Sequence, residues 1–215
     1  MVSEETHWEK AAKTRMGKYL AQVETDFIFN SLSSSHIRDI MDLGAETGRF
    51  SSLELETNAR TMSIDIDSYG LKRLKLKVKH VNVIQADARK IPVKNEVFDA
   101  IVMIEVLDYI SDIEAALREC RRTLKLHASF VISFGNKSSL KASLRKMLGK
   151  SYRHSYGVVM RVLSQTAFTV KQKMGYSWLP RQNLRKPLDT FFGRNRKTLC
   201  LETNPNLKSM GNSVR

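Results

Sequence analysis

The amino-acid sequence predicts a doubly wound α/β domain, with a mostly parallel sheet of seven strands and helices on both faces. Short apolar segments alternate along the chain with amphipathic segments of helical periodicity, which is the order of elements that such a sheet requires. The third, fourth and fifth apolar segments are nearly continuous runs, as expected for parallel strands covered on both faces. With 215 residues, 42% of them hydrophobic and 27% charged, the chain has ordinary globular composition, which excludes a wholly disordered, collagen-like or coiled-coil protein.

The expected elements follow one another in a regular order. Apolar side chains recur with helical spacing from Trp8 to Ile28, and the serine-rich segment 31–35 indicates a loop. Strands are then expected at residues 37–43, 61–66, 81–86, 100–104, 130–134, 169–179 and 198–202. Helices are expected between the strands at residues 49–58, 68–77 and 113–124, and after Gly135 at residues 138–148 and 158–166.

The length favours a single domain with small appendages. We expect one domain over residues 1–203, including an N-terminal helical cap (1–35) and a basic insertion (136–157), followed by a flexible tail (204–215). Two cysteines are too few for a disulfide framework or a cysteine-rich zinc site, so we expect reduced thiols and no metal. The acidic first residues and the shortness of the apolar runs favour a cytoplasmic protein without a signal peptide or a membrane span.

Positive charge is concentrated in the last third of the chain. The net charge is +14, yet residues 1–136 hold 19 basic and 20 acidic side chains, whereas residues 137–215 hold 17 basic and 2 acidic ones. Segment 137–153 has six basic side chains and no acidic one. It would attract an acidic partner, either RNA or an anionic membrane surface or a phosphorylated small molecule, unless it is a solvated face that only aids solubility. Its single aromatic residue, Tyr152, argues against stacking on single-stranded nucleic acid.

Three turns that follow predicted strands carry the residues of a candidate site, because ligands of open α/β sheets bind at the carboxyl ends of the strands. The first turn reads DLGAETG over residues 42–48, where glycine permits a tight turn and close approach of the backbone to a ligand. Asp65 follows the second strand, where a carboxylate can accept hydrogen bonds from both ribose hydroxyls. Asp87 follows the third, where a carboxylate can accept a hydrogen bond from the amino group of a purine.

The patterns that bind pyrophosphate and triphosphate are absent. The first turn has glycines only at 44 and 48, so it is not the Gly-x-Gly-x-x-Gly of dinucleotide sites, and no phosphate loop ending in Gly-Lys-Ser/Thr occurs. The turns therefore favour an adenosine-type ligand without a triphosphate.

With these motifs in order, the chain resembles class I S-adenosylmethionine-dependent methyltransferases of the small single-domain type, similar to quinone-biosynthesis and natural-product enzymes. The resemblance covers about residues 37–133, and 23 residues separate Asp42 from Asp65 and 22 separate Asp65 from Asp87. It also rests on IP at 91–92, FDA at 98–100, IEVL at 104–107, ALRE at 116–119 and TLK at 123–125. It implies a Rossmann-like methyltransferase fold with the last strand antiparallel, and S-adenosylmethionine as cofactor.

The resemblance also implies roles for single residues. Asp42 would shape the first turn near the methionine part of the cofactor, and Asp65 would bind the ribose. Asp87 would meet the adenine amino group. The other cofactor-binding positions that it implies are the backbone of Gly44, Ala45 and Gly48 beside the cofactor, Ile66 against adenine, the Ala88 N–H at the ring, and Ile104 and Glu105 beside the sulfonium.

Two positions depart from the family pattern. Glu46 stands where the family usually has glycine, so its side chain would either crowd the cofactor, hold the methionine ammonium or repel the methionine carboxylate. Residues 126–128 (LHA) stand where a Pro-Gly-Gly turn is common, which we expect to change only the turn before the fifth strand. Because of Glu46, a methyltransferase-like binding module without turnover stays open beside the enzyme.

The methyl acceptor is not identified by the sequence. A small molecule or a lipid-like metabolite is the first expectation, and RNA bound by the basic C-terminal third is the alternative. A hydroxyl acceptor would also need a general base. The candidates are Glu105, Asp108, Tyr109 and His154. Many relatives have a Glu-His pair where Asp108 and Tyr109 stand. The acceptor pocket is expected between the N-terminal helix and segment 136–157, near Trp8, Tyr19 and Met147.

Overall fold

A computed structural model describes residues 5–33, 36–50, 59–78, 81–135, 154–176 and 196–204. The expected helix at 138–148, most of the one at 49–58, most of the basic insertion and the tail lie outside these ranges. Within them, none of the helices combines the length and apolar character needed to cross a bilayer.

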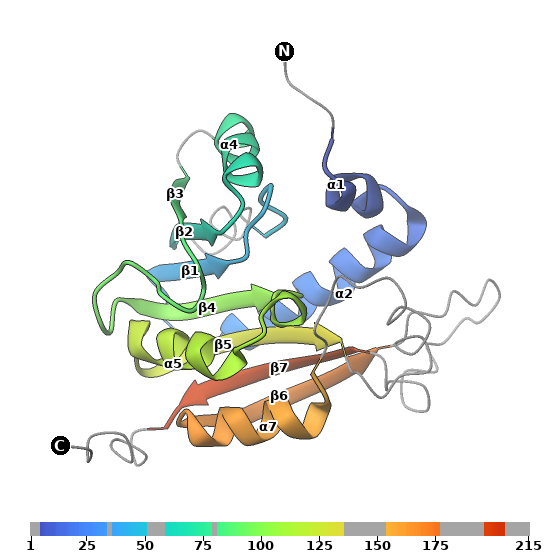
Figure 1. The fold of residues 1–215 in the computed structure, drawn as a ribbon. Helices are drawn as coiled ribbons and strands as arrows, with labels where there is room; N and C mark the ends of the chain where they lie inside the picture. The colour runs from blue at the N-terminus through green and yellow to red at the C-terminus, as the bar shows by residue number, and fades with distance from the viewer. Residues whose placement is uncertain are drawn as a thin grey trace.

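In the described part of the chain, seven strands form one sheet in the order β3-β2-β1-β4-β5-β7-β6 (Figure 1). The parallel part consists of β1 (Asp39–Leu43), β2 (Arg60–Asp65), β3 (Asn82–Gln85), β4 (Phe98–Ile104) and β5 (Leu124–Gly135). β7 (Arg196–Thr203) runs antiparallel to β5 and to β6 (Phe168–Tyr176). The predicted mostly parallel sheet with an antiparallel last strand is therefore confirmed.

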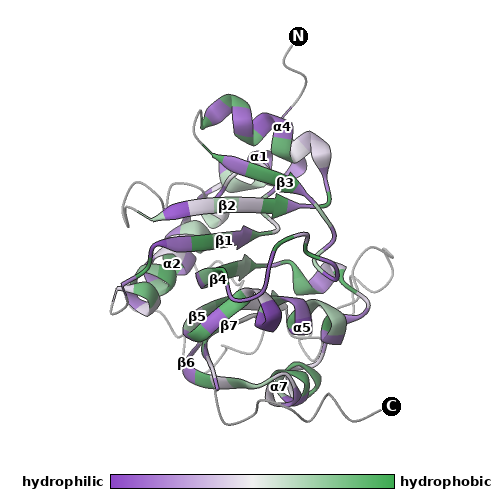
Figure 2. Ribbon diagram, turned by 90° about the vertical axis from the view of Figure 1, so that its left-hand side faces the viewer, coloured by the Kyte–Doolittle hydropathy of each residue, from purple (hydrophilic) through white to green (hydrophobic). Residues whose placement is uncertain are grey.

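Helices cover both faces of the sheet. On one face, α2 (Arg15–Leu32) buries Phe27, Ile28 and Leu32 against β1, β4 and β5, and α4 (Ser68–Lys77) packs beside β2 and β3. On the other face, α5 (Ile113–Thr123) and α7 (Tyr156–Gln165) enclose the larger core. Figure 2 shows hydrophobic and hydrophilic residues alternating along α4 and α5, as in helices with one buried face.

The prediction of one continuous helical segment from Trp8 to Ile28 is wrong in one respect, because the chain forms two helices there. α1 (His7–Ala12) begins with a capping box in which Thr6 and Glu9 bond to each other's backbone N–H groups. Thr14 caps α2 by accepting from the Gly17 N–H at 3.0 Å, so it breaks a pattern that is apolar-periodic throughout. α2 also runs through Ser31 to Leu32, so the loop expected at 31–35 begins later than predicted.

The fifth strand is longer than predicted. β5 follows α5 without a loop, and Leu124 already pairs with Phe98. The pairing shifts register before Ala100 meets Ser129, and His127 in between has a left-handed backbone (φ 59°). Residues 126–128 are therefore an irregularity inside the strand rather than a turn before it.

Candidate functional site

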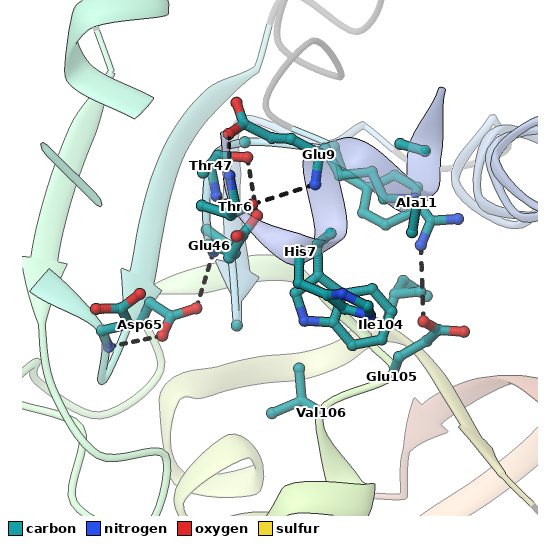
Figure 3. A pocket seen from close by; sticks show the side chains of 18 of the residues that line it. Thr6, His7, Glu9, Ala11, Glu46, Thr47, Asp65, Ile104, Glu105 and Val106 are labelled. Carbon is teal, nitrogen blue, oxygen red and sulfur yellow. Dashed lines mark hydrogen bonds and ion pairs between the residues drawn. The ribbon is translucent and has the colours of Figure 1, made fainter. Parts of the chain in front are cut away.

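A cavity of about 1630 Å³ lies at the carboxyl ends of β1, β2 and β4. Figure 1 shows the arrowheads of β1 and β4 pointing toward α1 and α2, which form the cap on this side of the sheet. Residues from both helices line the cavity together with the turns that follow the strands (Figure 3). Its volume exceeds the roughly 300–1,000 Å³ of a typical single-ligand pocket.

The turn after β1 depends on glycine at two positions. Gly44 has φ 84° and Gly48 has φ 87°, both in the left-handed region. A Cβ on Gly44 would lie 2.1 Å from Cγ2 of Val106, in the turn after β4. The N–H groups of Gly44 and Ala45 both donate to the Ile64 carbonyl, at 2.7 and 3.2 Å. This turn therefore lies tightly against the ends of β2 and β4.

Asp65 ends β2 with its carboxylate at the cavity wall. One oxygen accepts from the Glu46 N–H at 2.8 Å and the other from the Asp67 N–H at 2.8 Å (Figure 3). Burial raises the pKa of Asp65, and these two hydrogen bonds partly offset that effect. The next side chain, Ile66, is 66% exposed although it is apolar, and it also lines the cavity. A fixed hydrogen-bond acceptor thus stands next to a bare apolar surface.

Asp42 lies beneath the turn, 2% exposed. Its Oδ2 atom is buried without a hydrogen-bond partner among the described residues. Burial, with the charge of Asp65 as a smaller contribution, raises the pKa of Asp42 to about 7. Asp42, predicted among the cofactor-binding residues, is not one of the residues that line the cavity. Positive charge bound above Asp42 and Asp65 would favour the charged forms of both carboxyl groups.

The Glu46 side chain folds onto the turn after β1, where its carboxylate binds the neighbouring Thr47. The backbone of Glu46 has φ 46°, in the left-handed region that favours glycine. Its carboxylate accepts from the N–H and the hydroxyl of Thr47, at 2.9 and 2.8 Å. Gly70 of α4 permits this arrangement, because a Cβ there would lie 3.0 Å from the Glu46 backbone. Thr47 thus holds the carboxylate that the sequence placed among the cofactor-binding positions.

The turn after β3 lines the cavity with Ala86, Asp87, Ala88 and Arg89. The Asp87 carboxylate makes an ion pair with the Arg89 guanidinium at 2.6 Å and also accepts from the Arg89 N–H. Hydrogen bonds from Arg89 lower the pKa of Asp87, so its carboxylate stays charged at neutral pH. Asp87 is at the expected place, but Arg89 already occupies part of its hydrogen-bonding capacity.

Ile104 and Glu105 border the cavity at the end of β4. Glu105 has a left-handed backbone (φ 63°), and its N–H donates to the Ser133 hydroxyl at 3.0 Å. A strained non-glycine residue of this kind persists only where its surroundings hold it. Its carboxylate, 12% exposed, lies 3.8 Å from the guanidinium of Arg49 (Figure 3).

The four candidate catalytic side chains do not converge. Glu105 and Tyr109 line the cavity, and Tyr109 is 52% exposed. Asp108 instead accepts from the Gly135 N–H at 3.2 Å, which ties η1 (Leu107–Tyr109) to the end of β5. His154 Nε2 lies 2.8 Å from the Ile110 carbonyl, to which it donates. Neither Asp108 nor His154 lines the cavity.

α1 is attached to the rest of the domain mainly by polar and aromatic contacts. α1 has no buried residue, but Glu9 makes ion pairs with Arg73, at 2.9 Å, and with Lys77 of α4. Burial alone would raise the pKa of Glu9, but hydrogen bonds from Lys77, Thr6 and Arg73 lower it to about 2. The Trp8 ring meets the Tyr109 ring edge-on at 6.5 Å. α1 thus bridges α4 and η1 across the cavity.

His7 and Arg49 are among the cavity residues with functional groups that the sequence interpretation did not single out. His7 reaches from the start of α1 toward Ile104 (Figure 3), and no sequence signal marks it. Arg49 directly follows Gly48, a position that could have marked it, and its guanidinium bonds to the fully buried Glu24 of α2. Of the expected acceptor-pocket residues, Trp8 lines the cavity, Tyr19 does not, and Met147 lies outside the described ranges.

Comparison with known proteins agrees with this geometry. Residues 41–132 match the family model of a methyltransferase domain. A stretch of 101 residues is 35% identical to an uncharacterized protein of Methanocaldococcus jannaschii, covering 47% of this chain and 42% of that protein. A stretch of 100 residues is 23% identical to a probable S-adenosylmethionine-dependent methyltransferase of Mycobacterium tuberculosis, covering 46% and 36%. The matches thus span less than half the length of these relatives.

Solved structures share the fold over nearly the whole chain. A methyltransferase from Archaeoglobus fulgidus superposes with a TM-score of 0.72 at 14% identity, covering 93% of this chain and all of that one. The N-methyltransferase NodS from Bradyrhizobium japonicum, crystallised with S-adenosyl-L-homocysteine, gives 0.70 at 18% identity, covering 95% and 94%. The ordered motifs, this fold and the match to a methyltransferase domain at residues 41–132 together support a class I S-adenosylmethionine-dependent methyltransferase.

Proposed function

We propose that this protein is an enzyme that transfers the methyl group of S-adenosylmethionine to a small-molecule or lipid-like acceptor. The observation that carries the proposal is the Asp65 carboxylate, fixed at the cavity wall between the glycine turn and the exposed side chain of Ile66. That arrangement offers a hydrogen-bond acceptor for ribose hydroxyls beside an apolar surface for a flat ring.

The other residues of the cavity fit the same cofactor. The tight turn at Gly44 brings backbone close to the ligand space without side-chain bulk. The Asp65 carboxylate at the cavity wall, with the Asp42 carboxyl group buried beneath it, favours a cationic ligand such as a sulfonium. Glu46, which departs from the family pattern, keeps its carboxylate on Thr47 and so is compatible with a bound cofactor.

The protein's part in the reaction would be alignment. When bound, S-adenosylmethionine supplies a strongly electrophilic methyl group on its sulfonium. The chain's own residues would then orient the acceptor in line with that group and exclude water, which can be worth roughly 7–11 kcal/mol. Among the candidate bases, Glu105 and Tyr109 line the cavity and can take a proton from a bound acceptor.

The cap favours a small acceptor over a polymer. α1 and the N-terminal part of α2 line the cavity with Trp8, Met16 and Leu20, and Glu9 connects α1 to α4 across the cavity. A small or elongated apolar molecule fits beneath such a cap more readily than a folded RNA. The alternative acceptor is RNA, bound by the basic residues of segment 137–153, and the test below includes an RNA pool.

The test combines cofactor binding with a screen of acceptors. Calorimetry should show one site each for S-adenosylmethionine and S-adenosyl-L-homocysteine, and Asp65→Asn should weaken both by at least tenfold. Asp67→Asn is the matched control, since asparagine can still cap α4 and should leave binding within twofold. Methyl-labelled cofactor is then incubated with separate metabolite, lipid and RNA pools.

Each outcome of the screen has a clear reading. Label in the metabolite or lipid pool supports the proposal. Label in RNA alone would show that the acceptor is RNA and not a small molecule or lipid. Binding of both cofactor forms without transfer to any pool would indicate a binding module. No binding at all would refute the cofactor site itself.

A further inference from the structure

We propose that His7, Trp8 and Tyr109 form the acceptor subsite, that this subsite takes a flat aromatic molecule with a hydroxyl group, and that His7 accepts the hydroxyl proton during methyl transfer. The inference rests on the proposed function, since it names the acceptor class and the base for the same cavity. It assigns the base to the cap helix α1 rather than to the residues that follow β4.

Two aromatic side chains meet at the corner of the cavity between α1 and η1. Trp8 is 41% exposed and Tyr109 is 52% exposed, and both line the cavity. Their rings are perpendicular, with the centroids 6.5 Å apart. A flat aromatic ring can lie against the face of one of them while it meets the edge of the other, and both contacts are favourable. A saturated molecule of the same size would lose this fit.

This aromatic corner lies at the end of β4, apart from the residues proposed to hold the adenosine part. Val106 and Ile110, on either side of η1, line the cavity next to Tyr109 and add apolar surface. Asp65 and Ile66 instead lie at the end of β2, and β1 separates β2 from β4 in the sheet. The aromatic corner is therefore a different part of the cavity from the ribose and adenine positions.

The His7 imidazole lies beside the same corner. Its ring centroid is 5.8 Å from that of Trp8, and Figure 3 shows the side chain directed toward Ile104, the residue expected beside the sulfonium. Among the described residues, none forms a hydrogen bond with this imidazole. Histidine side chains take up protons near neutral pH, which is the property that a general base needs. His7 is also exposed, so a proton taken from the acceptor can pass on to solvent.

The two earlier candidate bases at the cavity are less suited to this step. The Glu105 carboxylate lies 3.8 Å from the guanidinium of Arg49, and a carboxylate paired with a cation is a weaker base. Tyrosine side chains ordinarily keep their proton at neutral pH, so Tyr109 suits the wall of the subsite better than the role of base. His7 is therefore the residue at this corner best placed to accept the proton.

The proposed step is balanced in atoms and in charge. A lone pair of the acceptor oxygen forms a bond to the methyl carbon, the bond between carbon and sulfur breaks, and its electron pair stays on sulfur. The hydroxyl proton moves to the unprotonated ring nitrogen of His7 and then to water. The products are the methyl ether of the acceptor and S-adenosyl-L-homocysteine, so no oxidant or reductant is needed.

Two probes test the subsite by binding. Calorimetry measures the affinity of 2-naphthol, and of decahydro-2-naphthol with the same carbon skeleton but no flat ring, for the protein saturated with S-adenosyl-L-homocysteine. 2-Naphthol should bind about threefold to tenfold more tightly than the saturated probe. Trp8→Leu should remove most of this difference, whereas Trp8→Phe should keep part of it. The control His36→Gln, which changes an exposed histidine outside the cavity, should alter neither affinity.

Two nucleophiles then test the base. Labelled S-adenosylmethionine is supplied with 2-naphthol or with naphthalene-2-thiol at about pH 8, where the aromatic thiol is already ionised and needs no base. His7→Gln should lower kcat for 2-naphthol roughly 100-fold or more and change kcat for the thiol by less than about threefold. His36→Gln should leave both rates unchanged. Because α1 has no buried residue, these variants should fold, and thermal unfolding of each is recorded.

Four results would overturn the assignment. Two concern the acceptor class: equal affinity for the flat and the saturated probe, and methylation of neither nucleophile. The other two concern His7→Gln: an unchanged rate with 2-naphthol, and an equal loss with both nucleophiles, which would mean that His7 acts through the cap and not as a base.

The same measurements separate this inference from the proposed function. If the wild-type protein binds S-adenosyl-L-homocysteine but not 2-naphthol, this inference fails while the cofactor site stands. If it does not bind S-adenosyl-L-homocysteine, both fail together.

Discussion

Replacing Asp42 by asparagine should remove a pH-dependent cost of folding. Asp42 is 2% exposed, and its pKa is raised from 3.8 to about 7, first by burial and then by the charge of Asp65. Between these pKa values the unfolded chain has lost the proton while the folded protein keeps it, so stability falls as the pH rises from about 4 to about 7. A rise of this size corresponds to about 4 kcal/mol, because each tenfold change in acidity is worth 1.36 kcal/mol.

The assay is urea unfolding of the wild-type protein and Asp42→Asn at several pH values from 4.5 to 8. Asparagine brings its own pH-independent cost, since its amide also lies buried, so the informative quantity is the difference between the two proteins at each pH. That difference should shift in favour of Asp42→Asn by several kcal/mol up to about pH 7 and stay constant above it. If the free energies of unfolding of the two proteins differ by the same amount at every pH, Asp42 is not a buried, neutral group.

Two further perturbations test the turn and the cap. Gly44→Ala should cost about 2–5 kcal/mol in urea unfolding, because a left-handed alanine is strained and its Cβ would overlap Val106 at 2.1 Å; a change below 0.5 kcal/mol would contradict this geometry. Glu9→Gln should speed amide hydrogen exchange in α1 and release of S-adenosyl-L-homocysteine several-fold, because the ion pairs with Arg73 and Lys77 are lost. High salt should reduce the difference between the wild-type protein and this variant, and unchanged exchange in α1 would show that other contacts hold the cap.

The layered fold could be predicted because its central strands must be apolar on both faces. Residues 100–104 and 130–134 are nearly continuous apolar runs, and both lie within buried strands. The helix expected from periodicity at residues 68–77 has those bounds in the structure, where the Asp67 side chain caps it. The place of the Asp65 carboxylate could be predicted because the carboxyl ends of parallel strands meet at one edge of the sheet.

The ends of several helices and strands depend on local interactions that cannot be predicted from hydrophobic periodicity. The apolar pattern continues across Lys13 and Thr14, yet the Thr14 hydroxyl begins a new helix there. β5 begins as soon as α5 ends, with no turn residue between them, so no pattern in the sequence predicts that Leu124 pairs with Phe98. Left-handed His127 then absorbs the register shift inside the strand.

The orientation of side chains in the site could not be predicted from their types. Asp108 and His154 have suitable groups for acid–base chemistry, but backbone groups of Gly135 and Ile110 occupy them. Arg49 meets Glu24, which is 25 residues away on another helix, only after α2 has packed on the sheet. Such contacts depend on tertiary packing rather than on spacing along the chain.

The most direct test of the cofactor site is a crystal structure of the protein with S-adenosyl-L-homocysteine. The ribose hydroxyls should lie within hydrogen-bond distance of the Asp65 carboxylate, with adenine against Ile66. A ligand bound outside this cavity, or one whose ribose does not contact Asp65, would contradict the assignment.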